Sequence, residues 1–194
     1  EGKGILMLAS MEGGFRNMIN NKKPVSSPAD VSGVKYRVMQ NPVYIDMFSS
    51  LGGNAVPMAW GETFTAVQQG TIDGLEIPIA VIDSSKYNEV TKYLSLTNHT
   101  YSMIALLISK KSMDKLPRDL QEVVREAGRT ALGAQRIAAG ANAKALVDTL
   151  AKKGMKVNQV SDIPAFRASV RPVYEKFKGS IGADVMTDVM NAVK

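Results

Sequence analysis

The chain contains no cysteine, one histidine and one tryptophan among its 194 residues. Without cysteine it has no disulfide bond, no thiol nucleophile and no thiolate ligand for a metal. A metal site built on several imidazoles is excluded as well, because His99 is the only histidine. The absence of cysteine is compatible with an oxidising or a reducing compartment.

Long apolar runs are also missing. No segment approaches the roughly 20 apolar residues that a membrane-spanning helix requires. The opening residues, EGKGILMLAS, contain a short apolar segment over 5–9, which is typical of a buried strand and lacks the long apolar core of a secretory signal. We therefore expect any export signal to have been removed or to lie outside this chain.

Signatures of catalysis and of nucleic-acid binding are equally scarce. The net charge of +6 comes from 24 Lys and Arg against 18 Asp and Glu, scattered without basic blocks, which favours a solvated basic surface over nucleic-acid binding. The patterns GxxxxGK[ST], HExxH and GxSxG do not occur. Asp73 and Glu76 are a candidate carboxylate pair, but residues three apart in an extended segment point to opposite faces. We therefore predict no enzyme, no cofactor and no metal.

Patterns typical of strands and helices alternate in the first half of the chain. The polar stretch MEGGFRNMINNKKPVSSPAD is expected to form turns, because of its Gly, Asn and Pro residues. We predict strands over 5–9, 35–39, 55–58 and 72–79, helices over 43–51, 61–69 and 81–87, and one or two strands within 92–109. This alternation indicates a parallel or mixed α/β sheet.

The second half is dominated by one long helical pattern over 117–150, followed by a strand over 155–160 and helices over 163–177 and 181–193. At 1.5 Å per residue the long helix would reach about 45–50 Å, so we expect it to cross between two domains. Gly128, Gly133 and Gly140 lie along it. Each is unfavourable in a helix, which predicts a bend or a close backbone contact.

A fixed charge stands inside one predicted strand, in the stretch GVKYRVMQNP. Arg37 is close to the carboxyl end of this strand, where open α/β sheets bind ligands. Its guanidinium offers a planar fork of donors that matches a carboxylate with two parallel hydrogen bonds. Residue pattern alone leaves two alternatives, a ligand anchor and an ion pair on the surface.

Several motifs in a fixed order carry a resemblance to a known family. They are the run GVKYRVMQNPVYIDMFSSLGGNAVPMAWGETFTAVQQGTIDGLEIP, the following SSKYNEVTKYLSLTNHTYS, the upstream GGFRN and the downstream ISKKSMDKLPRDLQEVVREA. Together they cover essentially the whole chain. The sequence resembles the solute-binding proteins of tripartite ATP-independent periplasmic (TRAP) transporters, the DctP family.

The resemblance implies a two-lobed α/β fold of the periplasmic-binding-protein type, similar to type II, that closes around an organic acid by a hinge motion. It also implies a periplasmic location, delivery of the acid to the small and large membrane subunits of a TRAP transporter, and no enzymatic activity. The alternative is a ligand-sensing bilobal domain of a signalling system.

The resemblance further implies that the first lobe is incomplete. Family members begin with an export signal and a first-lobe segment, and residue 1 of this chain is expected to fall near the end of that segment. We expect residues 1–14 and 103–142 to form a partial first lobe, and residues 15–102 and 143–194 to form the second lobe. A half lobe leaves apolar surface uncovered, which predicts aggregation or pairing with a partner.

Four ligand-binding residues follow from matching this sequence to the family motifs. Arg37 in KYRV corresponds to the principal carboxylate-binding arginine, Arg16 in GGFRN to a second arginine, and Trp60 in PMAWGE to an aromatic ring that packs on the ligand. The alternative for Trp60 is a core residue. In IDGLEIP, where many relatives have DGQENP, Ile77 replaces an asparagine that contacts the ligand, so we expect a less polar pocket on that side.

Overall fold

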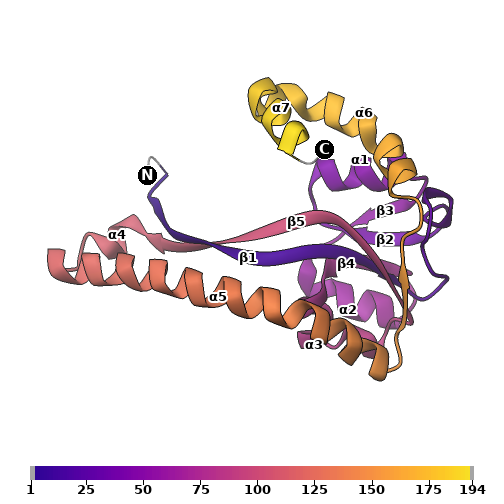
Figure 1. Cartoon of the computed structure of the whole chain (residues 1–194), viewed down its shortest axis with the longest axis horizontal. Helices are drawn as coiled ribbons and strands as arrows, with labels where there is room; N and C mark the ends of the chain where they lie inside the picture. Colours follow the sequence, from indigo (N-terminus) through magenta and orange to yellow (C-terminus); the bar gives the residue numbers. More distant parts are fainter. Residues whose placement is uncertain (1–2, 193–194) are drawn as a thin grey trace. The chain divides into compact units, whose positions relative to one another are not determined.

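The computed structural model describes residues 3–192 and has the predicted α/β fold (Figure 1). Its strands form a six-stranded sheet in the order β3-β2-β4-β1-β5-β6. β2 runs parallel to β3 and to β4, and β5 runs parallel to β6. The parallel pairing of β2 with β3 and β4 follows from the helical connections between these strands.

The elements agree closely with those predicted, apart from β1. In chain order they are β1 Ile5–Asn20, η1 Pro28–Asp30, β2 Lys35–Val38, α1 Pro42–Ser50, β3 Asn54–Pro57, α2 Trp60–Gln68, β4 Gly74–Pro78, α3 Ile79–Ser84, η2 Tyr87–Glu89, β5 Tyr93–Ser109, α4 Lys110–Met113, α5 Arg118–Lys152, β6 Lys156–Gln159, α6 Ile163–Ile181 and α7 Ala183–Ala192. The last predicted helix extended to residue 193, which lies outside the described residues.

The chain divides into two compact units, and each is described by itself. The first unit comprises residues 1–17, 77–85 and 98–153, and the second comprises residues 18–76, 86–97 and 154–194. Residues 1–2 and 193–194 of these ranges lie outside the described residues. The lobe boundaries expected from the sequence stay a prediction.

The core of the second unit lies between its sheet and two helices. Tyr36 of β2 and Phe48 of α1 are fully buried, with ring centroids 5.0 Å apart, and Phe166 and Val170 of α6 pack against the same cluster. The hydroxyl of Tyr36 accepts a hydrogen bond from the Asn20 amide at 3.0 Å. Burial thus holds β2 firmly against α1, and Arg37 follows Tyr36 along this strand.

Local signals place the ends of α1 where the sequence predicted them. Asn41 is the N-cap, and its side-chain oxygen accepts a hydrogen bond from the Val43 amide at 2.9 Å. Pro42 occupies the first helical position, where a missing N–H costs nothing. Gly52, just beyond the helix, has a φ of 74°, which glycine adopts without strain.

The turn predicted around Gly13 is wrong, because residues 11–20 of the polar stretch belong to the long strand β1, and only residues 21–30 form bends and the 3-10 helix η1. A side chain at Gly13 would lie 2.9 Å from the carbonyl oxygen of Ser102 in β5. Glycine is therefore needed here for close approach of two backbones rather than for a reversal of the chain. Sequence alone does not separate these two uses of glycine.

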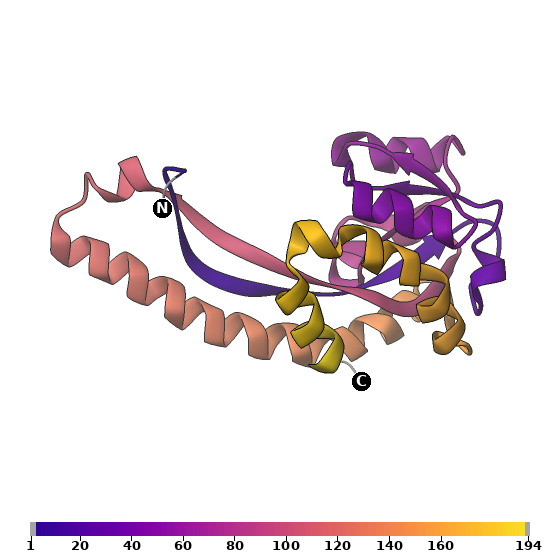
Figure 2. The same ribbon diagram turned by 90° about the horizontal axis from the view of Figure 1, so that it is seen from above.

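The long helix α5 belongs entirely to the first unit, where it runs beside β1 (Figure 2). The Gln135 side chain accepts a hydrogen bond from the Glu12 amide at 2.9 Å and donates one to the Glu12 carbonyl at 2.7 Å. The predicted close contact is found at Gly128, where an added Cβ would lie 3.0 Å from Leu8. Gly133 and Gly140 face open space instead.

None of the helices within residues 3–192 is both long enough and apolar enough to cross a bilayer. This agrees with the lack of long apolar runs in the sequence.

A candidate anion-binding site around Arg37

Arg37 occupies the penultimate position of β2, between two parallel neighbours. Its register partners are Val56 in β3 and Leu75 in β4. The carboxyl ends of β2 and β3 therefore meet at one edge of the sheet, and β3 leads there into α2 (Figure 1). This is the edge of an open α/β sheet at which ligands bind.

The guanidinium of Arg37 is held in a buried position. The residue is 5% exposed, its Nε donates to the carbonyl oxygen of Met58 at 3.0 Å, and its Cζ lies 5.7 Å from the centroid of the Trp60 ring. Arg37 is thus not an exposed charge on the surface. Burial lowers the local dielectric, so its hydrogen bonds to an anion would be stronger than in water.

Trp60 is the first residue of α2 and stands directly beside this charge. It is 45% exposed, so the alternative of a core residue is wrong. The centroid of its ring lies 5.6 Å from the Tyr87 ring centroid and 5.7 Å from Cζ of Arg37. A partly exposed ring beside a buried cation can cover the apolar part of an anionic ligand.

Tyr87 and Thr63 complete this cluster and were missed by sequence reasoning. Tyr87 is 1% exposed, and Thr63 of α2 is fully buried. Burial raises the pKa of Tyr87 to about 12, against the opposing effects of the Arg37 charge and the Thr63 hydroxyl. Tyr87 comes from a short 3-10 helix 50 positions after Arg37, and no sequence motif linked the two.

The other two predicted site residues belong to the first unit. Arg16 lies in β1 and is 8% exposed, and Ile77 lies in β4 and is 2% exposed. The structure therefore brings Arg37 and Trp60 together within one unit, whereas the ligand-binding roles of Arg16 and Ile77 stay predictions. Leu75, the other residue that departs from the family pattern, is fully buried opposite Arg37.

The candidate carboxylate pair has a structural explanation. Asp73 accepts a hydrogen bond from the Lys35 amide at 2.9 Å and forms an ion pair with Lys22 at 3.3 Å. Glu76 is completely buried. Asp73 thus fixes the start of β2 against β4. Among residues 3–192 there is also no group of three or more His, Asp or Glu side chains that could hold a metal.

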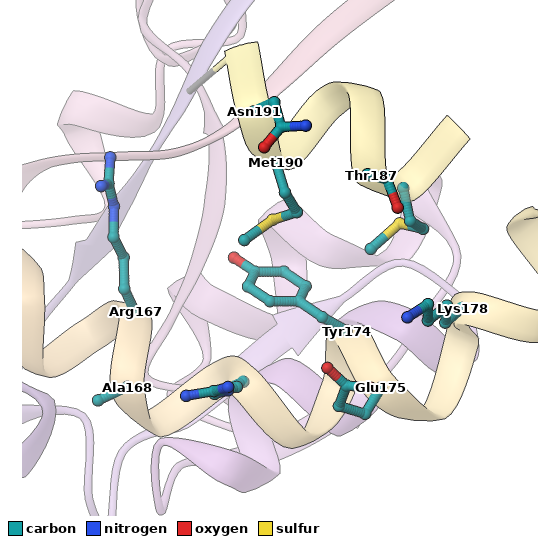
Figure 3. A pocket seen from close by; sticks show the side chains of 10 residues that line it. Arg167, Ala168, Tyr174, Glu175, Lys178, Thr187, Met190 and Asn191 are labelled. Carbon is teal, nitrogen blue, oxygen red and sulfur yellow. The ribbon is translucent and has the colours of Figure 1, made fainter. Parts of the chain in front are cut away.

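A separate cavity of about 540 Å³ lies between α6 and α7. Figure 3 shows the Tyr174 ring directed toward Met190 in this cavity, with Lys178 on the same helix. None of its lining residues belongs to the predicted ligand site. Arg167 and Lys178 are exposed, so the cavity is a hollow of the solvated surface.

A buried arginine and a half-exposed tryptophan at the carboxyl edge of a parallel sheet are features of a protein that binds an anionic solute. The chain belongs to the bacterial extracellular solute-binding protein family 7, DctP, whose family model matches residues 1–180. This agrees with the resemblance found in the sequence motifs.

Similar proteins have been named or solved in several bacteria. The chain is 39% identical over 192 residues to a solute-binding protein of Verminephrobacter eiseniae, covering 99% of this chain and 57% of that protein. It is 34% identical to the 2,3-diketo-L-gulonate-binding periplasmic protein YiaO of Escherichia coli, covering 97% of this chain and 58% of YiaO.

A solved structure also matches closely. The sugar acid-binding protein DctPAm of Advenella mimigardefordensis, in complex with galactonate, has a TM-score of 0.93 and 37% identity, over 98% of this chain and 62% of that one. The present chain thus spans less than two thirds of the length of these relatives.

Proposed function

We propose that this chain takes part in binding an organic-acid anion, as the extracytoplasmic solute-binding protein of a TRAP transporter. The observation that carries the proposal is the buried Arg37 guanidinium beside the half-exposed Trp60 ring. A carboxylate placed against Arg37 would receive charge-assisted hydrogen bonds in a setting from which water is largely removed.

The ligand class we favour is a hydroxylated carboxylate. Its support is that DctPAm was solved with galactonate and that a TRAP solute-binding protein of Polaromonas sp. JS666, 40% identical with a TM-score of 0.92, was solved with D-erythronate. In this proposal Arg37 holds the carboxylate, and Trp60 covers the carbon chain. Arg16 would supply a second positive charge, and Ile77 would make its side of the pocket apolar.

The proposed partners are the small and large membrane subunits of the transporter, and the proposed location is the periplasm. The family description as extracellular and the periplasmic name of YiaO support this location. The family and these relatives are solute-binding proteins rather than enzymes, so we propose no catalytic role. The sensing alternative is not favoured, because no relative described above is named as a sensor.

A ligand screen tests the proposal. The purified protein would be heated with galactonate, D-erythronate, glucuronate and C4 dicarboxylates, and the melting temperature recorded. A ligand at 100 times its dissociation constant adds about 2.7 kcal/mol to the free energy of unfolding. We expect at least one hydroxylated carboxylate to raise the melting temperature, and the rise to disappear in Arg37→Ala. No stabilisation by any organic acid would contradict the proposed function.

A further inference from the structure

We propose that Tyr87 is a positioning residue for the anion site, which orients the Trp60 ring and steadies the turn from β3 into α2. The inference rests on the proposed function of Arg37. Nothing in the sequence motifs assigned a role to Tyr87, and its 1% exposure indicates that it acts through its neighbours rather than by touching the ligand.

The first support is the packing of aromatic rings. Tyr87 contacts Trp60 at 5.6 Å and Phe64 at 5.4 Å between ring centroids, with tilted rings in both pairs. Trp60 and Phe64 are four residues apart on α2 and share one face of the helix. Tyr87 therefore packs against both rings along that face. An almost half-exposed tryptophan without this support would be free to adopt other rotamers.

The second support is the attachment of Arg37 to the segment that carries Trp60. Arg37 donates to the carbonyl oxygen of Met58, two residues before Trp60, at 3.0 Å. The Thr63 hydroxyl donates to the next carbonyl oxygen, that of Ala59, at 3.0 Å within α2. The segment that carries Trp60 therefore also holds the anion-binding arginine.

This turn has no capping side chain of its own, because the N-cap residue of α2 is Ala59. In most helices a Ser, Thr, Asp or Asn at that position would fix the first turn. Here the Thr63 hydroxyl bonds the Ala59 carbonyl from within the helix, and the Tyr87 ring packs on the helix face that carries Trp60 and Phe64. Loss of the Tyr87 ring would therefore loosen the segment that carries both Trp60 and the hydrogen-bond acceptor of Arg37.

Tyr87 is itself well anchored. Its carbonyl oxygen accepts hydrogen bonds from the Thr91 hydroxyl at 2.8 Å, the Thr91 amide at 2.9 Å and the Val90 amide at 3.1 Å. The preceding residue, Lys86, has a φ of 58°, in the left-handed region that non-glycine residues rarely adopt. Such local strain persists only where the surrounding contacts determine the backbone.

The test uses Trp60 as a probe, because it is the only tryptophan in the chain. Tyr87→Leu removes the ring, Tyr87→Phe removes only the hydroxyl, and Tyr93→Leu and Tyr93→Phe are matched controls at a tyrosine whose ring packs on Lys156. Fluorescence anisotropy and acrylamide quenching would be measured without ligand, and affinity for the acid identified in the screen, or for galactonate, would be measured by calorimetry.

We expect Tyr87→Leu to lower the anisotropy of Trp60, to increase its quenching, and to weaken acid binding about three- to tenfold, the size of one aromatic pair. Tyr87→Phe keeps the packing ring, so affinity and the Trp60 signal should both stay within about twofold of the parent. The Tyr93 controls should change neither property.

The proposal is overturned if Tyr87→Leu leaves the Trp60 signal equal to that of Tyr93→Leu. Should Tyr87→Leu fail to fold, Tyr87→Met takes its place, because it also removes the ring, and a Trp60 signal equal to that of Tyr93→Met would reject the positioning role. A changed Trp60 signal in a protein that binds no organic acid would support the positioning of Trp60 and contradict the proposed function instead.

Discussion

Replacing Arg37 is the most direct way to test how the site holds an anion. Arg37→Ala removes the guanidinium, and Arg37→Lys keeps the charge but loses the fork of parallel donors. Lys35→Ala is the matched control, since Lys35 lies on the same strand, is exposed, and bonds Asp73 through its backbone amide and carbonyl, which the substitution keeps. Arg37→Ala and Lys35→Ala each remove one positive charge from β2, whereas Arg37→Lys keeps it.

The expected magnitude follows from burial. Because Arg37 is 5% exposed, a bound carboxylate would be largely desolvated, and each charge-assisted hydrogen bond would contribute about 1.5–3 kcal/mol. Losing two such bonds in Arg37→Ala should cost about 3–6 kcal/mol, or roughly 150- to 25,000-fold in affinity. Arg37→Lys should lose about half of that free energy, and Lys35→Ala should change the affinity by less than about threefold.

Isothermal titration calorimetry with an acid and its neutral amide makes the assay specific. Galactonate and galactonamide differ in the group that Arg37 is proposed to bind. Arg37→Ala should weaken the acid far more than the amide, because only the acid carries the charge. Equal loss for both compounds, or an affinity for the acid within about threefold of the parent, would refute the reasoning.

Three further predictions concern stability and association. Asp73→Ala should lower the free energy of unfolding in urea by about 1–3 kcal/mol, because the hydrogen bond to the Lys35 amide is lost. Asp114→Ala is the control, because Asp114 forms an exposed ion pair, and it should cost about 0.5 kcal/mol or less. Equal losses would contradict the role of Asp73 in fixing the start of β2. The pKa of Tyr87 is raised from 10.0 to about 12, so the contribution of Tyr87 to stability should be constant below pH 10 and fall as the pH rises through that interval. Tyr87→Phe should therefore show a shallower fall of the free energy of unfolding between pH 10 and about 12 in urea melts. Met103 on β5 is 66% exposed. Exposed apolar surface favours association, so the parent chain by itself should self-associate in sedimentation velocity and the Met103→Lys variant should do so less. A monomeric parent would contradict this prediction.

Element ends were predictable where the signal is local. The Asn41 cap, the Pro42 start and the Gly52 stop act over a few residues, and the structure has α1 between them. Gly13 gave the wrong prediction because its contact, the Ser102 backbone, is 89 positions away in the chain. The same residue type serves a turn or a close approach, and only the partner decides which.

The candidate site shows the same division. The strand pattern and the family motifs pointed to Arg37 and Trp60, and these two residues are in contact. The role of Tyr87 was not visible, because packing between a helix and a distant 3-10 helix leaves no periodicity in either segment. It emerged from the contacts of the Tyr87 ring with Trp60 and Phe64 of α2.

The sequence by itself determined the α/β class, most helix and strand positions and the membership in the DctP family. These depend on local propensity and on motifs whose order survives in the linear chain. Tertiary structure decided that Arg37 is buried, that Trp60 is half exposed and that Tyr87 packs against the Trp60 ring. Burial and hydrogen bonding depend on partners from other strands and helices, and those are set only when the chain folds.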